Sequence, residues 1–76
     1  MVNNEHMTKA KTLLAEATRR GRDEIPDNSS ITNFDGWDSL SHMRLILAME
    51  ENLGKELPPE VIMEIETLED IAKYLS

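Results

Sequence analysis

Gly36-Trp37-Asp38-Ser39-Leu40 is the stretch around which this sequence is organised. Glycine favours a turn, and an aspartate or serine directly before a helical pattern is a favourable N-cap. Ser39 is therefore expected where a loop becomes a helix. The free backbone N–H groups at such a position favour a phosphate or another anion. We interpret the Ser39 hydroxyl as an attachment point for a group that the chain carries.

The helix that follows is expected to run from about Ser39 to Leu53, with Asp38 or Ser39 as its N-cap and Gly54 just past its end. At about 100° per residue, four apolar side chains fall on one side of this helix. A single apolar stripe is what a surface helix needs to pack on its neighbours. The predicted core side consists of Leu45, Ile46, Met49 and Leu53.

A second apolar group lies on the opposite side of the same helix and consists of Leu40, Met43 and Leu47. For Leu40 alone, cover by a third helical segment is an equally good interpretation, because single apolar residues are common on surfaces. Methionine is flexible and polarizable, which suits a surface that fits several partners. We therefore expect Met43 and Leu47 to be at least partly exposed and to dock onto partner enzymes. The charged border of this predicted surface is Arg44, Glu50 and Glu51.

Helical spacing also predicts a first helix over roughly residues 5–20 and a last helix that opens at the capping-box sequence Thr67-Leu68-Glu69-Asp70. A short third helix is expected after Pro58-Pro59, since proline is tolerated in a first turn. Residues 21–37 predict a long ordered crossover, held onto the helices by three apolar side chains. These are Ile25, Ile31 and Phe34.

No strand pattern or repeat is present, so the predicted fold is all-α: a small four-helix bundle of three longer helices and one short helix, with a long first loop. Residues 1–76 are expected to form one domain, in which residues 1–6 are candidates for disorder. A domain of this size buries a modest core. We expect no room for a deep enclosed active site.

The charge is unevenly distributed along the chain. Residues 1–34 hold five acidic and five basic side chains, whereas residues 35–76 hold ten acidic and three basic ones and so account for the net charge of −7. Nucleic acid requires a basic footprint, so it is excluded as a partner. The acidic half favours a basic protein partner, and an equally plain interpretation is that these acids only keep a small domain in solution.

The chain has no cysteine, so any thiol chemistry must be imported on a cofactor. No apolar run reaches the length needed to span a bilayer, and the N-terminus lacks the apolar region of a signal peptide. The default expectation is a cytoplasmic monomer.

An enzyme is the first alternative. Ser39 and His42 are three residues apart on the predicted helix, and Asp35 or Asp38 completes a triad on paper. The sequence offers no nucleophile elbow and no recognisable oxyanion arrangement. We therefore expect no catalytic activity, and a plain role for His42 at the edge of the core. Two distant histidines do not suggest a metal site.

Several of these residues carry a resemblance to a known family. The pattern Asp38-Ser39-Leu40 followed by a helix resembles the acyl carrier protein family, in register with elements further along the chain. The similarity runs without gaps from Asp38 to the C-terminus and extends more loosely through the first helix. The further elements are Glu50-Glu51, Leu57-Pro58-Pro59, Ile65 and Thr67 through Tyr74-Leu75.

The resemblance implies that Ser39 is modified by a 4′-phosphopantetheinyl transferase, which Asp38 helps to recognise. The thiol of the attached 4′-phosphopantetheine would hold an acyl or aminoacyl group as a thioester, and this fits the absence of cysteine. The implied partners are this transferase, an acyl- or aminoacyl-loading ligase, and downstream transferases or synthases. Ile62 joins the predicted partner surface. Because the chain begins with a methionine, we expect a free-standing carrier.

The chain departs from the fatty-acid carriers of this family after the Asp-Ser-Leu motif. Those carriers usually have acidic residues where this chain has Ser41, His42 and Arg44. Trp37 before Asp38 resembles carriers of specialised pathways. The cargo stays open between fatty acyl, polyketide, aminoacyl and hydroxyacyl groups. The main alternative is an unmodified helical interaction module that keeps the carrier fold.

Overall fold

The computed structural model describes residues 4–75, and the expectation of disorder for residues 1–3 lies outside this range. Four α-helices form: α1 (Asn4–Thr18), α2 (Ser39–Leu53), α3 (Pro59–Glu64) and α4 (Leu68–Leu75). A single 3₁₀ turn, η1 (Arg22–Glu24), lies in the first loop and was not predicted. Within residues 4–75 no strand forms, so the predicted all-α bundle with one short helix is confirmed.

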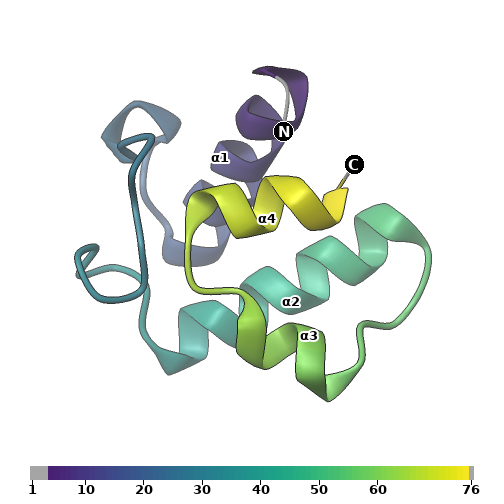
Figure 1. Cartoon of the computed structure of the whole chain (residues 1–76). Coiled ribbons are helices and arrows are strands. Elements are labelled where there is room, and N and C mark those ends of the chain that lie inside the picture. Colours follow the sequence, from purple (N-terminus) through teal and green to yellow (C-terminus); the bar gives the residue numbers. More distant parts are fainter. Residues whose placement is uncertain (1–3, 76) are drawn as a thin grey trace.

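The core lies where α1 meets α4 and α2 (Figure 1). Each of these helices turns an apolar stripe inward, and α4 has the sharpest division between an apolar and a polar side. The predicted core side of α2 is confirmed for Leu45, Ile46 and Met49, which are fully buried, while Leu53 is half-buried. Across residues 4–75, every helix is too short or too polar to span a bilayer.

The ends of the helices follow their capping residues. Gly54 follows α2 in the left-handed conformation, with φ of 72°, as its predicted place past the helix end requires. Thr67 and Asp70 form the predicted capping box: the Asp70 N–H donates to Thr67 Oγ1 at 3.0 Å, and the Thr67 N–H donates to Asp70 Oδ2 at 3.1 Å. The first helix begins close to the predicted start, but it ends two residues earlier than predicted, at Thr18, where Arg19 takes a positive φ of 59°. Residues 4–6, which were candidates for disorder, are helical.

The long loop between α1 and α2 is an ordered crossover along one flank of the bundle (Figure 1). Ile25 is buried and Phe34 is half-buried, as expected, but Ile31 is exposed and does not pin the loop through its side chain. Backbone hydrogen bonds between the loop and the α3–α4 connection hold this part of the loop instead. The Ile31 N–H donates to the Glu66 carbonyl at 2.8 Å, and the Leu68 N–H donates to the Ser29 carbonyl at 3.0 Å. The loop is thereby tied to the α3–α4 connection.

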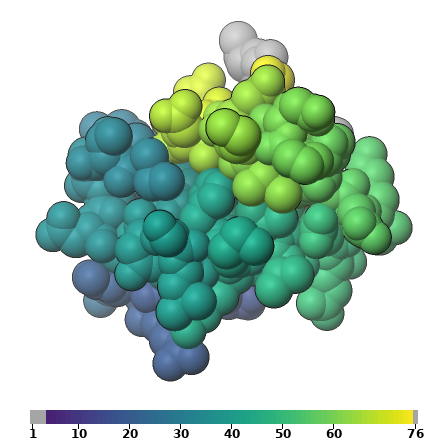
Figure 2. All heavy atoms as spheres, turned by 90° about the horizontal axis from the view of Figure 1, so that it is seen from below, coloured from purple at the N-terminus to yellow at the C-terminus, as the bar shows by residue number. Residues whose placement is uncertain are grey.

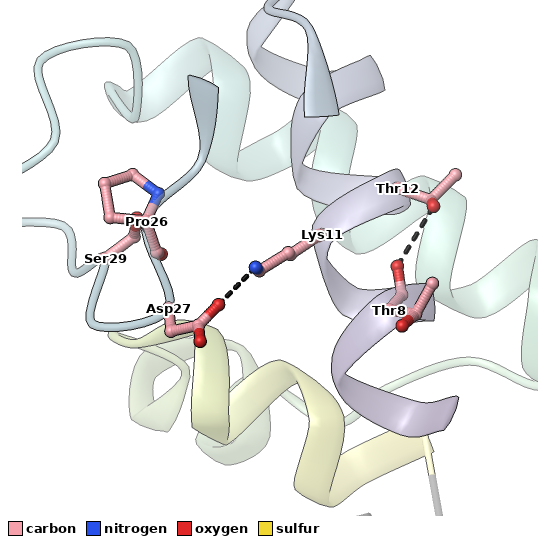
Figure 3. A network of polar contacts seen from close by, with 6 residues as sticks. All are labelled: Thr8, Lys11, Thr12, Pro26, Asp27 and Ser29. Carbon is pink, nitrogen blue, oxygen red and sulfur yellow. Dashed lines mark hydrogen bonds and ion pairs between the residues drawn. The ribbon is translucent and has the colours of Figure 1, made fainter. Parts of the chain in front are cut away.

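A second tie joins the loop to α1 (Figure 3). Lys11 of α1 forms an ion pair with Asp27 in the loop, next to a tight turn in which Ser29 Oγ donates to the Pro26 carbonyl at 2.6 Å. Away from this ion pair, Thr12 Oγ1 donates to the Thr8 carbonyl within α1 at 3.0 Å (Figure 3). The crossover therefore reaches the start of α2 from a fixed direction.

Candidate functional site

The start of α2 is set by Asp38, whose backbone is extended, with φ of −97° and ψ of −175°. Asp38 Oδ1 accepts a hydrogen bond from the Ser41 N–H at 2.8 Å, and the Asp38 carbonyl accepts one from the His42 N–H at 2.8 Å. The backbone hydrogen bond from Ser41 lowers the pKa of Asp38, because it stabilises the carboxylate. Of the two N-cap candidates in the sequence, Asp38 and Ser39, Asp38 is therefore the N-cap.

Ser39 is the first residue of α2 and its side chain is exposed. Ser41, two residues later, is buried. The first N–H groups of a helix have no carbonyl partner within it, and here the Asp38 side chain satisfies only that of Ser41. Ser39 thus presents an accessible hydroxyl at the positive end of a fifteen-residue helix.

His42 is held from two sides. Trp37 is buried, and its Nε1–H donates to His42 Nδ1 at 3.0 Å, with the two rings stacked at a centroid distance of 6.1 Å. His42 Nε2 lies 2.9 Å from the carbonyl oxygen of Ile62 in α3. Both ring nitrogens are therefore engaged away from Ser39. The serine–histidine pair of the enzyme alternative does not form, and His42 has the structural role expected at the edge of the core.

The second apolar side of α2 is open to solvent. The exposed fractions are 59% for Leu40, 52% for Met43 and 61% for Leu47, so the predicted exposure of Met43 and Leu47 is confirmed and α3 does not cover Leu40. Met63 of α3 is 79% exposed. Viewed from below, α2 and α3 lie next to each other on this face (Figure 2). We call Leu40, Met43, Leu47 and Met63 the outer surface.

The sequence pattern did not indicate Met63. Of the apolar residues in α3, only Ile62 was predicted to belong to the partner surface. The signal was present in the spacing, since three adjacent apolar residues in a helix cannot all face one side.

The remaining residues of the predicted partner surface differ in their surroundings. Arg44 and Ile62 are half-buried, and Glu51 is exposed and also lines a shallow groove between α1 and α2. Glu50 is half-buried, and its Oε2 accepts a hydrogen bond from the Leu57 N–H at 2.8 Å. Glu50 therefore stabilises the connection between α2 and α3 as well as contributing charge.

An open apolar groove of about 400 Å³ lies between the long loop, α2 and α3. Ile62, which the sequence assigned to the partner surface, and Ile65 both line it, and Ile65 also belongs to the core with Leu45 and Ile46. The full lining is Ile31, His42, Ile62, Met63, Ile65 and Glu66. Among residues 4–75 there is no group of three or more side chains that could hold a metal ion.

A small helical bundle with an exposed serine at a helix start and a shallow apolar groove beside it has the features of a carrier domain. The family model described as "Phosphopantetheine attachment site" matches residues 8–75. The chain is 34% identical to an acyl carrier protein of Clostridium perfringens over 68 residues, which cover 90% of each chain. It is 33% identical to an acyl carrier protein of Bdellovibrio bacteriovorus over 67 residues, covering 88% of this chain and 86% of that protein.

A third relative is an acyl carrier protein of Cyanidioschyzon merolae, 29% identical over 75 residues, which cover 99% of this chain and 82% of that protein. The chain belongs to the acyl carrier protein family. Family membership makes it a non-catalytic carrier with a covalently attached 4′-phosphopantetheine group. Its partners are a phosphopantetheinyl transferase and acyl-handling enzymes.

Proposed function

We propose that Ser39 is the residue that carries 4′-phosphopantetheine. The observation that supports this is the exposed hydroxyl on the first residue of α2, at a helix end that favours the negative charge of a phosphodiester. Ser41 is unsuitable, because its side chain is buried. The attached group supplies a thiol that holds the cargo as a thioester, in a chain that has no cysteine of its own.

The attachment reaction requires little of this chain. Ser39 Oγ attacks the pantetheine-bearing phosphorus of coenzyme A, the new P–O bond replaces the pyrophosphate linkage, and adenosine 3′,5′-bisphosphate leaves. The base that takes the hydroxyl proton and the metal ion that neutralises the pyrophosphate belong to the transferase. Asp38 has two roles in this proposal: it caps α2, and its carboxylate helps the transferase recognise the site.

The outer surface, together with Arg44, Glu50, Glu51 and Ile62, is proposed as the docking surface for partner enzymes. Exposed leucine and methionine side chains beside charged residues can supply the apolar centre and polar rim of a transient interface. Acidic residues predominate in residues 35–76, which favours partners with a basic face.

We further propose that the carrier serves a specialised biosynthetic pathway with acyl or aminoacyl cargo. The support is the segment Ser41-His42-Met43-Arg44, which is less acidic than the corresponding segment of fatty-acid carriers, together with Trp37. Trp37 and His42 are joined by the hydrogen bond from Trp37 Nε1–H to His42 Nδ1. A single carrier domain over residues 1–76, a monomeric state and a cytoplasmic location are parts of the same proposal.

Intact-protein mass spectrometry tests the attachment. After incubation with a broad-specificity phosphopantetheinyl transferase and coenzyme A, the wild-type protein should gain the mass of one phosphopantetheine group, and Ser39→Ala should gain none. Ser41→Ala is the matched control and should be modified. Absence of a mass gain with several transferases would instead support the unmodified interaction module.

A further inference from the structure

The third helix is the least buried of the four α-helices in residues 4–75. α3 has six residues and none of them is buried, whereas α1, α2 and α4 each bury at least four. An element with few buried apolar contacts opens at a lower free energy than the core. The polar contacts of α3 should therefore contribute a larger share of its local stability than similar contacts do in the other helices.

One of these contacts satisfies a carbonyl that the helix itself leaves unpaired. In a continuing helix, the Ile62 carbonyl would accept from the Glu66 N–H, but that N–H donates to Asp70 Oδ2 at 3.0 Å. His42 Nε2, at 2.9 Å, takes its place. A second side-chain tie of α3 is at its end, where Tyr74 Oη donates to Glu64 Oε2 at 2.6 Å. His42 thus holds the middle of α3 and Tyr74 holds its last turn.

The orientation of the His42 ring follows from its other neighbour. An indole N–H can only donate, so the 3.0 Å contact with Trp37 requires His42 Nδ1 to be an unprotonated acceptor. The proton of the neutral ring is then on Nε2, which donates to the Ile62 carbonyl. Trp37 is buried and stacked on the His42 ring, so it fixes the orientation of this ring. Through His42, Trp37 therefore determines where α3 can lie relative to the start of α2.

We propose that His42 is a positioning residue, which in its neutral form fastens α3 to the start of α2 through the series Trp37, His42 and Ile62. Protonation would place a second N–H opposite the Trp37 N–H, so two donors would face each other and the ring would have to turn. Charged groups around this contact include Glu66, which lines the same groove, Asp38, the N-cap of α2, and Arg44, two residues further along α2.

The groove beneath α3 lies between this helix and the loop and contains His42 itself. Its access therefore depends on the position of α3. In a carrier, the same contact would govern how far the groove opens beside the attachment site, and this consequence rests on the proposed function. The fastening of α3 is independent of the proposed function. It can be measured in the unmodified protein.

Hydrogen exchange of the full unmodified chain, followed by mass spectrometry, tests the proposal. His42→Ala should accelerate exchange of α3 amides at neutral pH by roughly three- to tenfold, the range expected for loss of one hydrogen bond. Exchange in α1 and α4 should change much less. His6→Ala is the matched control on the other histidine and should leave α3 unchanged. Equal exchange of α3 in His42→Ala and the wild type would overturn the proposal.

A conservative variant separates positioning from a simple packing role. His42→Gln offers a donor and an acceptor at the same place, so it should restore slow exchange of α3 at neutral pH. Trp37→Phe removes the N–H that orients the His42 ring, so it should accelerate exchange of α3 as His42→Ala does. Exchange of α3 in His42→Gln that is as fast as in His42→Ala would refute the proposal.

Discussion

The two sides of α2 carry the same kinds of side chain in opposite surroundings. Leu45 is fully buried, whereas Leu47, two residues later, is 61% exposed; Met49 is buried, whereas Met43 is 52% exposed. The inner side belongs to the core, where α2 packs on α1, whereas the side chains of the outer side are open to solvent. Hydrophobicity alone therefore does not say what a residue does here. The inner side should stabilise the fold, and the outer side should serve partners.

The largest effect is expected from a matched pair of leucine truncations. Leu45→Ala should lower the free energy of unfolding by about 2–5 kcal/mol, because it leaves a cavity in the core. Leu47→Ala should change it by less than about 0.5 kcal/mol, as is usual on a surface. Urea denaturation followed by circular dichroism measures both. Similar losses in the two variants would show that the two sides are not functionally separate.

The outer side should respond when a partner is present. Leu47→Glu should reduce kcat/KM of phosphopantetheinyl transfer by about tenfold, the loss expected for a significant interface residue, while stability stays close to that of the wild type. Asn52→Glu adds the same charge on another exposed part of α2 and is the control. A steady-state assay of coenzyme A consumption measures the rates. An equal decrease for both variants would point to charge rather than to the outer surface.

The cap that begins α2 should give a smaller effect with a distinct pH dependence. Because the pKa of Asp38 is lowered in the folded state, its carboxylate contributes stability above the pKa of the unfolded chain, and this contribution disappears as the pH falls through the folded-state pKa. Asp38→Asn keeps a capping side chain without the charge. The stability difference between wild type and Asp38→Asn should therefore be constant near neutrality and shrink in acid. Denaturation midpoints across a pH series would reveal it, and a difference independent of pH would contradict this assignment.

The smallest effect is expected at the ion pair between Lys11 and Asp27, which joins α1 to the long loop (Figure 3). Asp27 is 78% exposed, and exposed ion pairs contribute roughly 0–1 kcal/mol. Lys11→Met should therefore lower the free energy of unfolding by less than about 1 kcal/mol, and added salt should reduce the difference. A salt-independent loss larger than that of Leu45→Ala would reverse the order of importance between core and surface contacts.

Much of α2 could be predicted from the sequence, because local signals mark both its ends. Asp38 and Gly54 fix its start and end, and helical spacing separates Leu45 from Leu47. The exposed Ser39 follows from the same local pattern. These features depend on residues within one or two turns of each other, which is the range over which capping and periodicity act.

The features that could not be predicted depend on contacts between distant parts of the chain. His42 meets the Ile62 carbonyl twenty residues away, and no local pattern specifies that contact. The loop was expected to be pinned by the side chain of Ile31, but it is held by that residue's backbone N–H, which any residue except proline could supply. Sequence patterns report side-chain character, and both of these contacts use backbone groups.

Fragmentation of the modified protein would test the central claim most directly. After treatment with a phosphopantetheinyl transferase and coenzyme A, tandem mass spectrometry should place the added group on Ser39 and on no other serine, including the buried Ser41. Location of the group on another residue, or modification of Ser39→Ala to the same extent as the wild type, would contradict the account.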